Sequence, residues 1–516
     1  MRPVHPPELP APPHFLCASV VKTKRLLATA ALSPLVLFAL VSVVRPAPAA
    51  PAAEDVTAAA AQLTAAYRTR LEALAKWCDE HKLAEQAART RDWLRRPQPV
   101  TLEIPILPSS PDWNPPAGAS PEVREWCGRF RQLREERGQE LFELAKQALS
   151  GHRPTLAFEL LTSAVRENPD HAEGRRILGY EQFGGGWRTP YEATQARARK
   201  VWHDKYGWLL AERVARYEAG ERYELGHWSP AADSARRHGD IVHGWDIETE
   251  HYHVRTDHSL EEGVRLAARL ERLYRAWQQL FVAYYVSEAE LRRAFAGGTI
   301  EPRRRVRHQV TYFRNRDEYV AEMQKIDPRV GMTTGYYYPP QRKAFFFVPA
   351  EPDDSTVYHE ATHQLFGEMR PVVPLPGREA NAWVLEGVAC FMESLVERDG
   401  FCVLGGVNAV RLSGARQRLL VDSFYVPLAE LVGLSMERLQ SDQRIRGLYT
   451  EASGLTYFLV FDGQGRFRDT LVAYLVAIYT GRDRTGTLAQ LTGSDYSRLD
   501  AEYRAFVQST ATGRSD

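Results

Sequence analysis

The sequence predicts an α+β protein in which a helical N-terminal half precedes a half that mixes strands with helices. Apolar residues recur with helical spacing over much of residues 54–235. Near residue 240 the pattern changes to the alternation of β-branched and aromatic residues that is typical of strands. The second half also contains an H-E-x-x-H pentapeptide at residues 359–363. These observations divide the chain into residues 1–53, 54–235 and 236–516.

Length and composition narrow the class of protein. The chain has 516 residues, of which 25% are charged and 44% apolar, and its formal net charge is +1. It is therefore long enough for two or three domains with cores of their own. The balanced charge argues against a nucleic-acid binder, and the apolar content argues against a disordered protein. We interpret the basic run Arg303–Arg307 as a solvated strand end rather than a phosphate site.

Residues 1–53 predict export. Lys22, Lys24 and Arg25 precede an apolar run over residues 26–44, and the small residues 47–50 follow. This order is that of a signal peptide with its cleavage site. The apolar run is nearly as long as a membrane span, so an uncleaved membrane anchor is the alternative. Pro34 within the run favours cleavage. Either form predicts a periplasmic, extracellular or cell-surface protein.

The cysteines leave two alternatives open. Removal of a signal peptide would remove Cys17 and leave Cys78, Cys127, Cys390 and Cys402 in an oxidising compartment. Pairing Cys78 with Cys127 and Cys390 with Cys402 keeps each bridge within one domain. Four free buried thiols fit the sequence equally well.

The N-terminal half has the pattern of a helical scaffold. A helical pair is predicted over residues 54–94, a Pro-rich linker or extended strap over 97–121, and a further helix over 121–149. Residues 155–180 resemble a single tetratricopeptide-type helical pair, without a second copy at a fixed period. Gly and Pro clusters over residues 184–192 interrupt the pattern before another helix. A helical spacer or scaffold is the simplest interpretation, and a peptide-binding helical module is the alternative.

Strands and helices alternate in the second half. We expect a strand over residues 245–255, a long helix over 260–284, a strand over 306–313 and a helix over 317–325. Residues 336–348 form two aromatic β-prone runs joined by a Pro-containing turn, which predicts a hairpin. Its edge either accepts a substrate backbone by strand addition or simply contributes to the core. His251, His253 and His258 fall in or near the first strand and have no acidic or cysteine partner at ligand spacing, so we interpret them as ordinary strand histidines.

The pentapeptide predicts one face of a metal site. His359 and His363 are four residues apart, so a helix places both imidazoles on the same side. Glu360 is rotated away from these ligands, where its carboxylate can reach a water molecule beside a metal. The apolar residues Val357, Ala361 and Leu365 recur every four residues and predict the side that packs on a core.

A second helix supplies the candidate third ligand. Residues 383–395 have an apolar face, and Glu386 lies off that face. Its neighbours Gly387 and Ala389 are small enough to let this helix approach the first one closely. A carboxylate would complete a three-ligand zinc site with one open position. The alternative is a solvated acidic stripe formed by Glu379, Glu386, Glu393 and Glu397. Cys390 points the same way as Glu386 and is a weaker candidate ligand.

H-E-x-x-H followed by a W-x-x-E-G-x-A helix is similar to the gluzincin zinc metallopeptidases of the aminopeptidase-N-like and peptidase-MA-like group. The segment from about 245 to 510 resembles an uncharacterised exported family beside them. This resemblance implies a zincin-like catalytic domain, with a small sheet and helices followed by a helical subdomain. It also implies Zn²⁺ held by His359, His363 and Glu386, with Glu360 as the base. Tyr449, with Tyr457 as the substitute, would correspond to the tyrosine that steadies the oxyanion.

Several positions depart from related patterns. Aminopeptidases of this group carry a G-x-M-E-N strand, whereas residues 331–335 here read Gly-Met-Thr-Thr-Gly, without the glutamate that holds a free amino terminus. This difference argues against exopeptidase action. Leu385 replaces an asparagine that often precedes the ligand glutamate. The metzincin pattern is excluded, because Phe366 and Met369 stand where it requires Gly and His.

The sequence thus predicts zinc-dependent hydrolysis of peptide bonds by an exported protein, with a peptide or protein as substrate and no nucleic-acid partner. Membrane attachment through residues 1–53 is an open alternative to secretion. Two other functions remain compatible with the residues. One is an exported helical binding or scaffold protein whose zincin-like domain does not turn over, and the other is zinc-dependent hydrolysis of a non-peptide bond.

Overall fold

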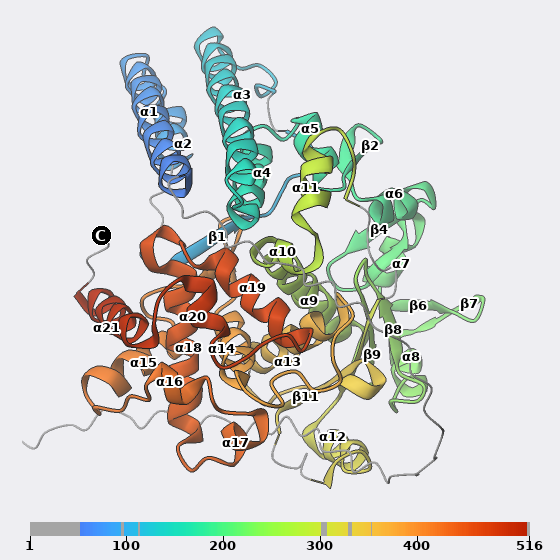
Figure 1. Cartoon of the computed structure of the whole chain (residues 1–516). Coiled ribbons are helices and arrows are strands. Elements are labelled where there is room, and N and C mark those ends of the chain that lie inside the picture. The colour runs from blue at the N-terminus through green and yellow to red at the C-terminus, as the bar shows by residue number, and fades with distance from the viewer. Residues whose placement is uncertain are drawn as a thin grey trace, which may run out of the picture.

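A computed structural model describes residues 52–512 except 94–97, 112–113, 301–306, 329–332 and 352. The protein has the predicted α+β character, with long N-terminal helices, a five-stranded sheet and a group of C-terminal helices (Figure 1). Residues 1–51 of the predicted signal or anchor segment and the basic run at Arg303–Arg305 lie outside the described residues. Among the residues that the structure describes, none of the helices is both long and apolar enough to cross a membrane bilayer.

The N-terminal helices form an arm that projects from the body (Figure 1). The predicted helices are confirmed as α1 (Ala52–Glu80), α2 (Ala84–Trp93), α3 (Pro121–Ser150), α4 (Pro154–Glu167) and α5 (Ala172–Ile177). The far part of the arm has a small core of its own around Tyr67, Leu71, Trp126 and Phe130. The near ends of α1 and α3 instead join the main core of the molecule through Val56 and Leu141.

The Pro-rich segment is an extended strap, which was one of its two predicted forms. Its strand β1 (Thr101–Pro105) pairs antiparallel with β14 (Phe401–Gly405), and β14 also pairs with β13 (Val396–Arg398). Leu102 and Ile104 alternate toward the main core and are buried there. The strap therefore connects the N-terminal arm to strands 300 residues further along the chain.

Residues 181–237 contain three consecutive units, each made of a short hairpin followed by a helix, which the sequence analysis did not predict. Trp187, Trp208 and Trp228 lie on the second strands of the three hairpins. The units pack beside the five-stranded sheet and the helix of residues 260–280, whose Glu261 bonds Arg222 at 2.6 Å. Their elements are β2 (Glu181–Phe183), β3 (Gly186–Arg188), α6 (Pro190–Arg197), β4 (Lys200–His203), β5 (Gly207–Leu210), α7 (Val214–Glu218), β6 (Glu221–Glu224), β7 (His227–Pro230) and α8 (Ala231–Arg237).

The main sheet has the strand order β11-β12-β10-β9-β8. Strand β10 runs parallel to both β9 and β12, whereas the outer pairs are antiparallel. The single strand predicted over residues 245–255 is wrong, because the chain turns at residues 249–251 and forms two paired strands. The predicted hairpin near residue 340 is confirmed. The strands are β8 (Trp245–Glu248), β9 (Tyr252–Thr256), β10 (His308–Phe313), β11 (Gly335–Tyr338) and β12 (Lys343–Phe347).

The two faces of this sheet are covered differently. One face packs against α9 (Leu260–Leu280) and α13 (Ser355–Glu368), so Tyr337 and Phe346 belong to the main core. Residues on the opposite face, such as Tyr336 and Phe345, form a small cluster with α12 (Arg316–Met323). This alternation follows from the two-residue period of strand side chains. Two short helices, α10 (Val282–Tyr285) and α11 (Glu288–Phe295), follow α9.

The remaining helices complete the main core below the arm (Figure 1). Helix α14 lies between α13 and α18. All residues of α14 are buried, and so it is enclosed on every side rather than on one apolar face. These helices are α14 (Ala382–Met392), α15 (Val410–Leu420), α16 (Leu428–Leu431), α17 (Met436–Ser441), α18 (Ile445–Phe461), α19 (Arg468–Tyr479), α20 (Thr487–Thr492) and α21 (Tyr496–Thr512). The four cysteines that the structure describes form no disulfide bonds with one another.

Candidate metal centre

Helix α13 is fixed on the sheet at both ends. At its start, Gly335 of β11 allows a close approach, because a Cβ there would lie 2.6 Å from the Thr356 methyl group. At its end, Glu368 accepts a hydrogen bond from His308 of β10 over 2.9 Å. The predicted apolar stripe is confirmed, since Val357, Ala361 and Leu365 are all buried. The face that carries the two histidines is thereby directed toward α14.

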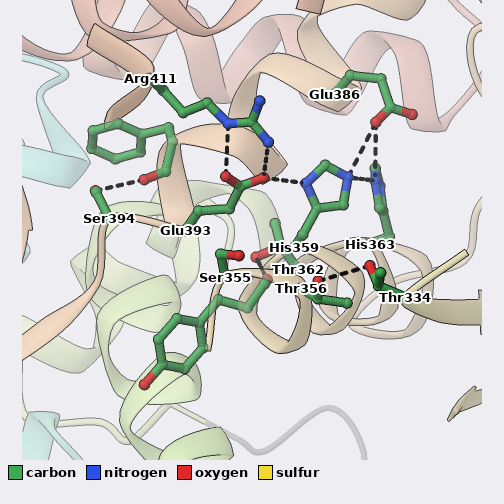
Figure 2. A network of polar contacts seen from close by, with 12 residues as sticks. Thr334, Ser355, Thr356, His359, Thr362, His363, Glu386, Glu393, Ser394 and Arg411 are labelled. Carbon is green, nitrogen blue, oxygen red and sulfur yellow. Dashed lines mark hydrogen bonds and ion pairs between the residues drawn. The ribbon is translucent and has the colours of Figure 1, made fainter. Parts of the chain in front are cut away.

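His359, His363 and Glu386 converge as the sequence predicted. His359 Nε2 lies 3.3 Å from Glu386 Oε2, and His363 Nε2 lies 3.5 Å from the same oxygen. The two Nε2 atoms are 3.3 Å apart. Figure 2 shows the three side chains pointing toward one another from two helices. The interpretation of Glu386 as part of a solvated stripe is wrong, because its side chain is only 1% exposed.

Contacts at the start and in the middle of the glutamate's helix hold it in place. Asn381, which precedes α14, donates to Asp483 over 2.7 Å and accepts from Tyr474 over 2.6 Å. Gly387 allows a close helix contact, but with α18 rather than with α13 as we expected from the sequence. A Cβ at Gly387 would lie 2.5 Å from the carbonyl oxygen of Ala452. The position of Glu386 thus depends on the C-terminal helices as well as on α13.

Glu360 lies beside the three candidate ligands without joining them. It is buried, and its Oε2 accepts a hydrogen bond from the backbone N–H of Tyr337 in β11 over 2.9 Å. Burial raises the pKa of Glu360, and the neighbouring His359 and His363 oppose this rise. The edge strand β11 therefore orients this carboxylate through its own backbone. Because the backbone N–H of Tyr337 already bonds Glu360, it is not available to pair with an added strand.

The charges of the site favour an ionised Glu386. Burial alone would raise the pKa of this carboxyl, but the imidazoles of His363 and His359 hold it well below its usual range. One of its oxygens, Oε1, is buried and has no hydrogen-bond partner. A buried carboxylate with an unsatisfied oxygen is costly unless a cation compensates its charge.

Two residues that the sequence analysis did not assign complete the network. Glu393 Oε1 accepts a hydrogen bond from His359 Nδ1 over 2.9 Å. Arg411 Nε and a terminal nitrogen then contact the two Glu393 oxygens, each at 2.7 Å (Figure 2). The only sequence signal for Glu393 was its spacing, since it lies seven residues, or two helical turns, after Glu386. Arg411 carried no local signal.

The predicted stripe of acids is therefore divided by the fold. Glu379 is 88% exposed and Glu397 is 41% exposed, whereas Glu386 and Glu393 face the two sides of the His359 ring. Cys390 is buried in the same place, and its sulfur lies with His359 and Glu393 in a second group of possible ligand atoms. Burial raises the pKa of the Cys390 thiol.

The two candidate tyrosines lie on α18 in different surroundings. Tyr449 is buried near Arg411, close enough for its phenol to interact electrostatically with the guanidinium. Tyr457 packs between Phe391 and Phe461 in the core. Tyr449 therefore stands next to the network around His359, and Tyr457 is an aromatic core residue.

The other histidines singled out from the sequence make ordinary polar contacts. His251 Nδ1 lies 2.7 Å from Glu271, and His253 lies 2.8 Å from Gln309 and 2.9 Å from Asp246.

No known protein-family profile matches the chain, and no curated protein has a significantly similar sequence. The chemical assignment of the site therefore comes from its own geometry.

Proposed function

We propose that the protein is an exported zinc-dependent hydrolase of peptide bonds, with a gluzincin-type site on a zincin-like domain. The observation that carries this proposal is the separation of the three ligand atoms, 3.3–3.5 Å. Donor atoms about 2.0–2.2 Å from a zinc ion in tetrahedral geometry lie about 3.3–3.6 Å apart. The chemistry of the donors also fits, because two imidazoles and one carboxylate form a common catalytic zinc set.

The proposal gives each of these residues a role. His359, His363 and Glu386 would hold a zinc ion, which when bound would supply a Lewis acid to polarise a carbonyl and acidify water. Glu360, oriented by the Tyr337 N–H, takes a proton from the attacking water and delivers it to the leaving amine. Tyr449 donates its phenolic hydrogen to the developing oxyanion. The substrate is a peptide or protein met outside the cytoplasm, and membrane attachment through residues 1–53 would keep the enzyme at the cell surface.

Metal analysis together with one substitution tests the proposal. We expect the purified protein to contain one zinc per chain and to cleave members of a peptide library. Glu360→Gln keeps the three ligand atoms, so it should retain zinc and lose hydrolysis by about 10²–10⁴-fold. Both quantities are measurable on one preparation, by elemental analysis and by mass spectrometry of the peptides.

The possible outcomes separate the competing functions. Zinc without cleavage of any peptide would favour a binding or scaffold protein, and cleavage of only a non-peptide bond would favour another hydrolase. Full activity of the Glu360→Gln variant would show that a different group is the base.

A further inference from the structure

We infer that Arg411 is a positioning residue that acts through Glu393 to hold His359 in its metal-binding orientation. This inference rests on the proposed metal site and extends it to a part of the chain outside both motifs. The three residues come from separate elements, because His359 lies on α13, Glu393 directly follows α14 and Arg411 is in the first turn of α15.

The geometry makes Glu393 a bridge between a cation and an imidazole. Its Oε1 receives the His359 Nδ1–H over 2.9 Å, and Arg411 contacts both of its oxygens at 2.7 Å. A guanidinium that grips both carboxylate oxygens fixes the plane of the carboxylate as well as its position. Glu393 and Arg411 are only 9% and 17% exposed, so water does not compete strongly for these bonds.

This arrangement determines which nitrogen of His359 is available to a metal. A neutral imidazole has one N–H donor and one lone pair, and donation from Nδ1 leaves the lone pair on Nε2. Nε2 is the atom that faces Glu386 and His363. Arg411 therefore influences the metal site over two hydrogen-bonded contacts, without contacting the metal position.

A second metal site is the competing interpretation of the same atoms. His359, Cys390 and Glu393 bring possible ligand atoms within 4.8 Å of one another. Arg411, however, already occupies both oxygens of Glu393 and brings a positive charge to that position. A metal ion there would have to displace the guanidinium or bind next to it, so the geometry favours a positioning role.

Zinc affinity is the quantity to measure. The dissociation constant for zinc can be measured on the chain that lacks only the predicted export segment, by competition with a chromogenic chelator. Circular dichroism first confirms that each variant is folded. We expect Arg411→Met and Glu393→Gln each to weaken zinc binding by about 10–100-fold. Because Arg411 acts through Glu393, the double variant should be little weaker than Glu393→Gln alone. Arg411→Lys retains a positive charge but not the bidentate contact with Glu393, so its zinc affinity should be intermediate.

Two further readouts exclude a general structural effect. Arg468→Met is a matched control, since Arg468 on α19 is 13% exposed and pairs with Glu159 at 2.6 Å, away from α15. It should bind zinc as the wild type does. Loading with Co²⁺ reports on ligand geometry, and we expect its visible absorption bands to change in Arg411→Met and to stay unchanged in Arg468→Met.

The results distinguish this inference from the proposed function. Wild-type zinc affinity in folded Arg411→Met, or additive effects in the double variant, would overturn the positioning role alone. A second zinc equivalent that binds more tightly in Arg411→Met would overturn it in favour of a second metal site. A wild-type protein that binds no zinc would overturn both proposals. One that binds zinc but hydrolyses no peptide would overturn only the hydrolase, while the loss of affinity in Arg411→Met would still support the positioning role.

Discussion

At the residue scale, the site consists of buried carboxylates that are paired with positive or proton-donating groups. Glu393 has Arg411 and His359 as partners, and Glu386 lies against His359 and His363. Burying two ionised carboxylates is unfavourable unless such partners compensate them. This compensation is more complete for Glu393, which is consistent with Glu386 being the group left to bind a cation.

Tyr449 provides a prediction at this scale. Tyr449→Phe removes the hydroxyl that we propose donates to the oxyanion. We therefore expect kcat to fall by about 10²–10³-fold while zinc content stays the same. Tyr457→Phe is the matched control, because the Tyr457 ring packs between Phe391 and Phe461. Steady-state kinetics on a cleaved peptide would check both variants. Equal kcat values in the wild type and Tyr449→Phe would exclude the oxyanion role.

Individual residues differed in how far the sequence could predict them. The histidine pair was predictable because four-residue spacing on a helix is a local property, and Glu386 because a second motif followed within a short distance. Arg411 was not predictable, since its contact with Glu393 depends on the way α15 packs in the folded chain. Glu393 had the right spacing, but a sequence of acids alone does not show which members are buried.

At the scale of elements, α18 connects the site to the C-terminal helices. Its residue Ala452 packs against Gly387 of α14, and its residue Glu451 faces Asp500 and Arg504 of α21. Glu451 is 2% exposed, and its Oε1 has no hydrogen-bond partner. Burial, together with the negative charge of Asp500, raises the pKa of Glu451 to about 8.

This shift predicts how stability depends on pH. The unfolded chain ionises Glu451 near pH 4.5, whereas the folded protein keeps it neutral up to about pH 8. The contribution of Glu451 to the free energy of unfolding therefore falls as the pH rises through this window, by on the order of 1 kcal/mol per pH unit. Glu451→Gln imitates the neutral form, so it should stabilise the protein little at pH 5 and increasingly toward pH 8.

Urea unfolding at several pH values measures this difference. The exposed Glu437→Gln on α17 is the control, and its effect should not depend on pH in the same way. A Glu451→Gln variant whose stability relative to the wild type stayed constant from pH 5 to pH 8 would contradict the buried neutral carboxyl.

The elements themselves were predictable where a periodic pattern extends over many residues. Helices such as α3 and α9 appeared in the sequence because apolar residues recur over many turns. The hairpins between residues 181 and 230 were missed because each strand has only three or four residues, too few to establish alternation. Their signal was the recurrence of Gly and Trp, at Gly186-Trp187 and Gly207-Trp208 and then Gly226 with Trp228. The strand pair β8–β9 was predicted as one strand because its turn, residues 249–251, contains no Gly or Pro to interrupt the alternation.

At the scale of the whole molecule, the parts of the chain share one main core. Val56 of the arm, Leu102 of the strap and Leu160 of α4 belong to the same cluster as Leu365 and Val384 near the site. The strap pairs with β14, which lies between α14 and α15 in the chain. These contacts are between residues far apart in the sequence, and so periodicity could indicate the class of each segment but not their association.

A common core predicts that metal binding stabilises the whole molecule. The three ligands lie on α13 and α14, which pack on the sheet and on α18, so unfolding of this core would separate them and release the metal. A ligand present at 1,000 times its dissociation constant stabilises the folded state by about 4 kcal/mol. We therefore expect calorimetry to show a melting temperature several degrees higher in excess zinc than after treatment with EDTA. Glu386→Gln removes a ligand and should lose most of this difference, whereas Glu360→Gln should keep it. A melting temperature that did not respond to zinc in the wild type, or responded equally in Glu386→Gln, would show that the three side chains do not form a metal site.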